Sequence, residues 1–133
     1  MVGVLILSHG NLAQELLRAA ETVAGTPQGF EALTLGWQEA VSEAQGRVAA
    51  AVHRLDRGEG VLILTDMFGN TPSNVALSFR NSAQVEVVSG VNLPMVVRLA
   101  CNKNRGMTLE ETAAWIRDKG KSSICCTPGR AEG

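Results

Sequence analysis

Two short, uninterrupted apolar runs, at residues 4–7 and 61–64, constrain the fold of this chain more than any other feature. A strand that faces water on one side alternates apolar and polar residues, whereas a continuous apolar run is typical of a strand buried on both faces. Stretches with helical periodicity follow each run. Alternating strands and helices predict a parallel sheet with helices on both faces. A length of 133 residues corresponds to one domain, over residues 1–133.

The full pattern predicts a doubly wound α/β fold with a mainly parallel, four-stranded sheet in the order 2-1-3-4. We expect strands over residues 2–7, 30–35, 61–65 and 85–88, and helices over 12–24, 39–55, 94–102 and 109–119. A further helix is expected to start at Thr71, which is a good N-cap and precedes a proline. Thr108 and Glu111 predict a capping box for the last helix, and residues 121–126 are expected to form a last short strand.

Helical spacing also predicts which side chains face the core. In the first helix the inward positions are expected to be Leu12, Leu16, Ala20 and Val23. In the second they are Ala44, Val48, Ala51, Val52 and Leu55.

Composition excludes several classes of function. A formal net charge of −1 does not favour nucleic acid or an anionic membrane as the main partner. No apolar stretch approaches the roughly 20 residues of a membrane span. The N-terminal apolar run has no basic segment before it, so it is interpreted as a buried strand rather than a signal peptide. We therefore expect a cytoplasmic protein.

The metal-binding residue types are scarce. Three cysteines, Cys101, Cys125 and Cys126, give no disulfide framework, and we expect them to be small buried apolar side chains in a reducing compartment. The two histidines are far apart in the sequence and no Cys-x-x-Cys occurs. Neither a metal ion nor another cofactor is therefore expected. His53 lies inside the second predicted helix and is interpreted as an ordinary surface residue.

The other histidine, His9, lies in Ser8-His9-Gly10 between the first strand and the first helix. Ligands of doubly wound sheets bind outside the carboxyl ends of the strands, where the strand order reverses. In the predicted order that point lies between the strands that end near His9 and Asp66, so these residues should be neighbours despite their separation in sequence. A carboxylate beside an imidazole fixes the tautomer and leaves the other ring nitrogen free as a nucleophile. Asp66 alone would otherwise be interpreted as a turn residue.

A histidine that attacks a phosphoryl group brings negative charge into its site, and helix N-termini stabilise such charge. The candidate phosphoryl-binding residues are Gly10, Gly69, Asn70 and Thr71: the glycines allow close approach of the backbone, and the threonine hydroxyl can donate a hydrogen bond. Aromatic side chains at loop tips, Phe68 and Trp37, are candidates for contact with a partner.

Three segments carry a family resemblance: residues 3–10, residues 60–72 with the run Thr65-Asp66-Met67-Phe68-Gly69-Asn70-Thr71-Pro72, and residues 88–95. In these segments the chain resembles the mannose-type IIA component of the bacterial phosphoenolpyruvate-dependent sugar phosphotransferase system. The resemblance implies that His9 takes a phosphoryl group from phospho-HPr and gives it to a IIB component. Asp66 would orient the ring, and Thr71 would place its hydroxyl near the phosphoryl group.

The resemblance also implies an assembly. The family fold has one antiparallel edge strand exchanged between two subunits, which here would be residues 121–126 of a homodimer. We expect a free-standing IIA component that reaches the membrane only through its transporter complex, whose membrane components bind the sugar.

Alternative functions follow from the same histidine. Histidine phosphatases and mutases place an arginine directly before the nucleophile, where this chain has Ser8, so that class is disfavoured. A regulatory protein that senses its own phosphorylation state would use the same chemistry as a carrier. The phosphotransferase subunit of dihydroxyacetone kinase shares the fold and the N-terminal histidine, but Gly10 and Asn92-Leu93-Pro94 favour the sugar-system family.

Overall fold

The structure is a computed structural model, and it describes residues 1–67, 71–79, 81, 84–102 and 106–129. Its strands are β1 (Gly3–His9), β2 (Phe30–Leu35), β3 (Val61–Thr65) and β4 (Val85–Ser89). Its helices are α1 (Leu12–Ala24), α2 (Val41–Leu55), α3 (Thr71–Leu77), α4 (Leu93–Cys101) and α5 (Leu109–Ser122). The strands form one sheet in the order β2-β1-β3-β4, and every pair is parallel. The predicted fold class and strand order are confirmed.

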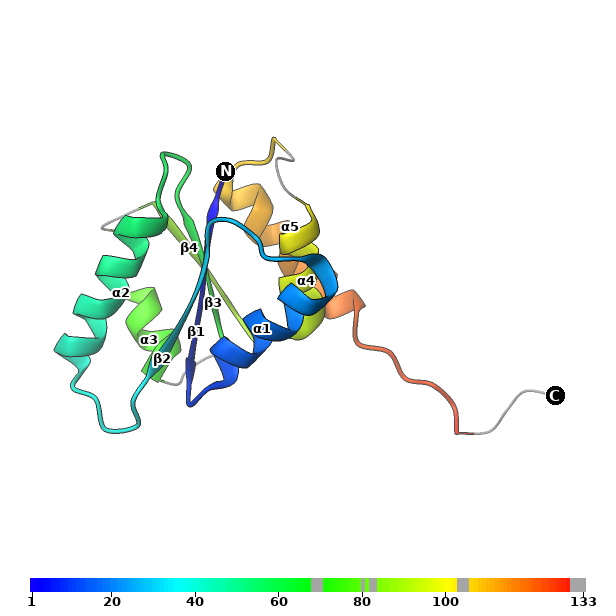
Figure 1. Cartoon of the computed structure of the whole chain (residues 1–133), viewed down its shortest axis with the longest axis horizontal. Coiled ribbons are helices and arrows are strands. Elements are labelled where there is room, and N and C mark those ends of the chain that lie inside the picture. The colour runs from blue at the N-terminus through cyan, green and yellow to red at the C-terminus, as the bar shows by residue number, and fades with distance from the viewer. Residues whose placement is uncertain (68–70, 80, 82–83, 103–105, 130–133) are drawn as a thin grey trace.

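Helices cover both faces of the sheet, as Figure 1 shows: α1, α4 and α5 lie on one side, and α2 and α3 on the other. Side chains of the central strands alternate between the two cores. Val4 and Ile6 of β1 face α1, α4 and α5, whereas Leu5 and Leu7 face α2 and α3. All of these side chains are buried, which explains why the strand sequences are continuously apolar.

Most predicted element boundaries are confirmed within two residues, and the exceptions have local causes. The second helix begins at Val41, not at residue 39, because a turn precedes it: the Glu39 N–H donates to the Gly36 carbonyl at 3.2 Å. The first strand continues to His9, whose position lies beside Leu35 of β2.

The predicted inward face of α1 is confirmed in part, since Ala20 is buried and Leu16 packs, partly buried, against the core. The buried residues are Ala13, Leu17 and Ala20, whereas Leu12 and Val23 are exposed. The buried Ser8 hydroxyl accepts a hydrogen bond from the Ala13 N–H at 2.7 Å, which sets the rotation of the first turn. The predicted inward face of α2, from Ala44 to Leu55, is confirmed.

The C-terminal prediction is also partly wrong. Lys121 and Ser122 belong to α5, which begins with the predicted Thr108–Glu111 capping box. A lysine in the last turn is favourable beside the helix carboxyl end, so the helix extends past residue 119. Residues 124–128 are not part of any strand of the described chain, and they run away from the body of the molecule (Figure 1).

The cysteines are exposed, which overturns the expectation that they are buried apolar side chains. Cys101 ends α4 on its outer side, and Cys125 and Cys126 lie in the C-terminal segment that leaves the body. In the described ranges, no helix is long and apolar enough to cross a membrane.

Candidate functional site

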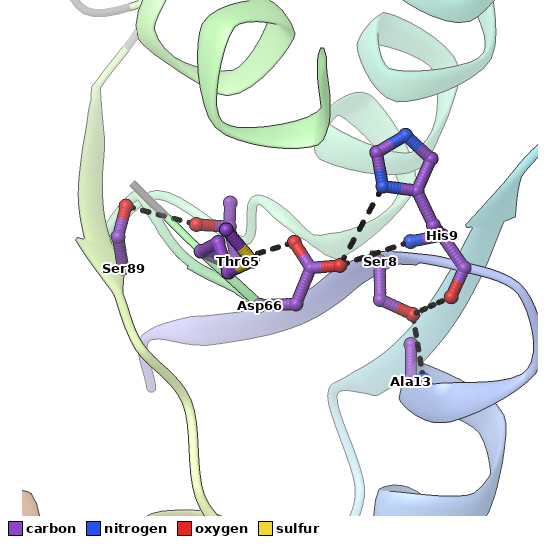
Figure 2. Close-up of polar contacts among 7 residues, drawn as sticks. Ser8, His9, Ala13, Thr65, Asp66 and Ser89 are labelled. Carbon is purple, nitrogen blue, oxygen red and sulfur yellow. Dashed lines mark hydrogen bonds and ion pairs between the residues drawn. The ribbon is translucent and has the colours of Figure 1, made fainter. Parts of the chain in front are cut away.

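His9 is the last residue of β1, at the carboxyl edge of the sheet. Ser8 is fully buried, and its hydroxyl donates to the His9 carbonyl oxygen at 3.1 Å while accepting from Ala13. Gly10 follows with a φ of +57°, a left-handed conformation that glycine adopts without strain. These contacts turn the chain from strand to helix within three residues and hold the His9 backbone in place (Figure 2).

Asp66 directly follows β3, the neighbour of β1. Its Oδ2 accepts the His9 backbone N–H at 3.2 Å and lies 3.7 Å from His9 Nδ1. Its Oδ1 accepts the Met67 N–H at 2.9 Å. The predicted juxtaposition of His9 and Asp66 is therefore present, and topology alone creates it, since the residues come from different strands.

The distance of 3.7 Å is too long for a direct hydrogen bond from Nδ1, but it places the carboxylate where it can stabilise positive charge on the ring. Two backbone N–H groups donate to the carboxylate and fix it beside the ring. In Figure 2 the Nδ1 edge of the imidazole faces Asp66, and the Nε2 edge points away from it. The side chains of His9 and Asp66 are only 14% and 13% exposed, so the pair is largely shielded from solvent screening.

Trp37 contacts His9 directly, which the sequence did not predict. The indole and imidazole rings are stacked, with centroids 4.2 Å apart and an angle of 3° between their planes. Trp37 is 77% exposed, in agreement with the prediction that it lies at a loop tip. The signal that identifies this contact is the strand register: His9 lies opposite Leu35, so the residues just after Leu35 emerge beside the imidazole.

The remaining predicted site residues differ in what the structure describes. Thr71 is the first residue of α3, which packs against β1 and β3, and its side chain is exposed. Phe68, Gly69 and Asn70 lie outside the described residues. His53 is exposed on α2, away from the carboxyl edge of the sheet.

Asn92, in the third motif segment, has a structural part in the fold. Its Oδ1 accepts the Met95 N–H at 3.1 Å, which caps α4, and its Nδ2 donates to the Gly120 carbonyl of α5 at 3.3 Å. Within the part of the chain that the structure describes, no group of three or more His, Cys, Asp or Glu side chains could hold a metal ion.

Four exposed apolar side chains surround the carboxyl edge near His9. They begin α1 and α2 or follow the ends of β2 and β3: Leu12, Val41, Trp37 and Met67. Large apolar side chains in contact with water are typical of a surface that docks a protein.

A largely shielded carboxylate beside a strand-end histidine in a parallel α/β sheet suits a protein whose histidine takes up and passes on a group. Residues 3–116 match the family model EIIA-man, described as PTS system fructose IIA component. The match spans most of the 133 residues, and the chain belongs to this family of IIA components. Its role is accordingly that of a phosphoryl carrier in the sugar phosphotransferase system.

Individual proteins to which the chain is similar are also named as IIA components. The chain is 36% identical over 128 residues to a protein of Escherichia coli (strain K12) named "Putative phosphotransferase enzyme IIA component YadI", covering 93% of this chain and 85% of that protein. Its structure is similar to the mannose/sorbose specific IIA subunit from Enterococcus faecalis, with a TM-score of 0.87, 25% identity and coverage of 99% and 98% of the two chains. It is also similar to the PTS IIA protein associated with the fucose utilization operon from Streptococcus pneumoniae, with a TM-score of 0.81, 33% identity and coverage of 95% and 96%.

Proposed function

We propose that His9 of this chain accepts a phosphoryl group from the phosphohistidine of HPr and passes it to a IIB component. The observation that carries the proposal is the orientation of the ring, with Nδ1 beside Asp66 and Nε2 on the opposite edge. A proton on Nδ1 is stabilised by the carboxylate, and the Nε2 lone pair is then available for attack.

The transfer balances without water or a cofactor. The Nε2 lone pair of His9 attacks phosphorus, a new N–P bond forms, and the N–P bond to the HPr imidazole breaks and returns its electron pair to that ring. In the second step a nucleophilic side chain of the IIB component attacks the same phosphorus, and His9 leaves as the neutral imidazole. Asp66 stabilises the positive charge that the His9 ring carries while it is phosphorylated.

The transferred group needs donors around its oxygens. Gly10 and the N-terminus of α1, a helix of 13 residues, supply backbone N–H groups and a favourable dipole next to His9. We propose that Thr71 adds its hydroxyl, and that Gly69 and Asn70 complete the phosphoryl-binding residues. The exposed apolar side chains around His9 provide the surface on which HPr and the IIB component dock in turn, and we propose Phe68 as a further contact.

Ser8 argues against the phosphatase alternative. Its side chain is fully buried and caps α1 through Ala13, so this position is part of the fold and has no room for the guanidinium that clamps a free phosphate ester. We place the protein in the cytoplasm, in transient contact with the membrane-bound transporter.

Labelling with phosphoenolpyruvate, enzyme I and HPr tests the proposal. The wild-type chain is expected to gain one acid-labile, base-stable phosphate, and His9→Ala is expected to gain none. His53→Ala is the matched control, since it removes the other of the two histidines from an exposed helix position and should label like the wild type. Equal labelling of His9→Ala and wild type would contradict the assignment. Transfer to a purified IIB component then measures the second step.

A further inference from the structure

Trp37 stacks on His9 although most of the Trp37 side chain is exposed to solvent, so burial does not explain its position. Trp37 is one of two tryptophans in the chain, and it is 77% exposed, so little burial holds it in place. It nevertheless lies flat against the imidazole, with ring centroids 4.2 Å apart and planes within 3° of parallel. The stack itself selects the rotamer of Trp37, and it can restrain the imidazole only if the backbone that carries Trp37 is also held.

The backbone turn that carries Trp37 is held by Glu39. The Gly36 N–H donates to Glu39 Oε1 at 3.0 Å, and the Glu39 N–H donates back to the Gly36 carbonyl at 3.2 Å. Arg47 of α2 donates to the same Oε1 at 2.7 Å. The Gly36 hydrogen bond, followed by Arg47, lowers the pKa of Glu39 below its ordinary value, so the carboxylate is charged at neutral pH and keeps the turn closed.

The direction of the stack suits nucleophilic attack. The lone pair of Nε2 lies in the plane of the imidazole, so an indole on the ring face leaves the attacking direction open. Asp66 holds the Nδ1 edge and Trp37 holds one face, and these two contacts together restrict rotation of the ring. Restricting a nucleophile to its reactive orientation raises its rate of attack.

We propose that Trp37 is a positioning residue for His9. The turn that Glu39 and Arg47 hold keeps the indole in contact with the imidazole, and this contact orients Nε2 toward the incoming phosphorus. The inference rests on the proposed function of His9, and it assigns Trp37 a part in the transfer step in addition to any contact with a partner protein.

A small phosphoryl donor separates positioning from docking. Phosphoramidate transfers its phosphoryl group to an imidazole and releases ammonia, and it needs no protein surface. Trp37→Leu keeps an apolar side chain but loses the flat face, and it is expected to label roughly two- to tenfold more slowly than wild type with phosphoramidate, in line with the strength of an aromatic pair. Trp37→Phe restores a flat ring and should recover most of the rate. Trp115→Phe, which changes the other tryptophan in the α1, α4 and α5 core, should behave like wild type.

Nuclear magnetic resonance of the unphosphorylated protein supplies a readout that does not depend on transfer. The indole ring current is expected to shift the imidazole carbon-bound protons of His9 upfield in wild type and Trp37→Phe, and not in Trp37→Leu. Glu39→Gln, which weakens the turn without touching His9, should reduce this shift and slow phosphoramidate labelling in parallel.

The possible results separate the two proposals. No phosphate on His9 of the wild type under any donor would remove the proposed function itself. Normal labelling of wild type with equal phosphoramidate rates for Trp37→Leu would overturn the positioning role alone. A defect of Trp37→Leu that shows only as a raised KM for phospho-HPr, with an unchanged phosphoramidate rate, would also overturn it and leave Trp37 as a docking residue.

Discussion

At the scale of single residues, Asp66 links the architecture of the sheet to the chemistry of the histidine. Its Oδ2 accepts the backbone N–H of His9 and also faces Nδ1, so one oxygen ties the ends of β1 and β3 together and sets the ring's environment. The structural contact needs only an oxygen acceptor, whereas stabilisation of a charged ring needs the negative charge. The two contributions can therefore be separated by one substitution.

Asp66→Asn is that substitution. The amide keeps the shape and an acceptor oxygen for the His9 N–H, and it loses the acceptor for the exposed Met67 N–H. We therefore expect an unchanged circular dichroism spectrum and a small fall in the melting temperature. Loss of the carboxylate charge 3.7 Å from the ring lowers the stabilisation of the positively charged, phosphorylated imidazole by about 1–1.5 kcal/mol. If the transition state for transfer loses the same stabilisation, the rate of transfer from phospho-HPr falls about tenfold. Rapid-quench kinetics measure this rate. Kinetics identical to wild type in a folded variant would remove Asp66 from the mechanism.

The sequence predicts the pairing of His9 with Asp66 because strand order determines it. It does not predict the stacking of Trp37 on His9 or the hydrogen bond from Ala13 to Ser8. His9 and Asp66 meet wherever two neighbouring parallel strands end at the same edge. The Trp37 contact depends on the path of the turn after β2, which in turn depends on Glu39 and Arg47. Such paths leave no periodic signal. The exposure of the cysteines was missed for a related reason, since residue type gives only an average tendency to be buried.

At the scale of elements, periodic patterns predict interiors better than ends. The strands at Phe30–Leu35 and Val61–Thr65 and the helix at Leu12–Ala24 have the predicted bounds, because their apolar patterns stop at turn residues. The inward face of α1 is predicted only in part: Ala20 is buried, but Leu12 is exposed because a buried hydroxyl from β1 orients the first turn. The predicted last helix, over residues 109–119, ends three residues before α5 does. The polar residues after Lys119 continue the helix but add no apolar position to its periodic pattern.

Two glycines test how tightly β1 packs on α2. A Cβ added to Gly3 would lie 2.6 Å from the Leu55 carbonyl oxygen, a backbone atom that cannot rotate away. We expect Gly3→Ala to lower the free energy of unfolding by about 1–3 kcal/mol. Gly46 is the matched control: it is exposed on α2 with nothing near its added Cβ, so Gly46→Ala should raise stability by about 0.5–1 kcal/mol. Urea denaturation measures the free energy of unfolding of both variants. Equal changes in the two variants would show that β1 and α2 can move apart to admit the Cβ without loss of stability.

At the scale of the whole molecule, the sheet ends at β4 on one side. In the described part of the chain β4 pairs only with β3, so its outer edge has free backbone groups. The segment after α5 leaves the body (Figure 1), and its Ile124 is 78% exposed. An apolar side chain on an extended segment and an unpaired strand edge are complementary features that a second copy of the chain can satisfy.

This complementarity leads us to propose a homodimer in which residues 124–128 of each chain pair with β4 of the other. Sedimentation at micromolar concentration should give about twice the chain mass of 14.1 kDa for the intact protein. Removal of residues 124–133 should give a monomer that still gains phosphate on His9, because the site is built from β1, β3 and the turn after β2 of one chain. Ile124→Lys should weaken the dimer by placing a charge where apolar contact is expected. A monomeric intact protein would contradict strand exchange, and a truncated dimer would place the interface elsewhere on the surface.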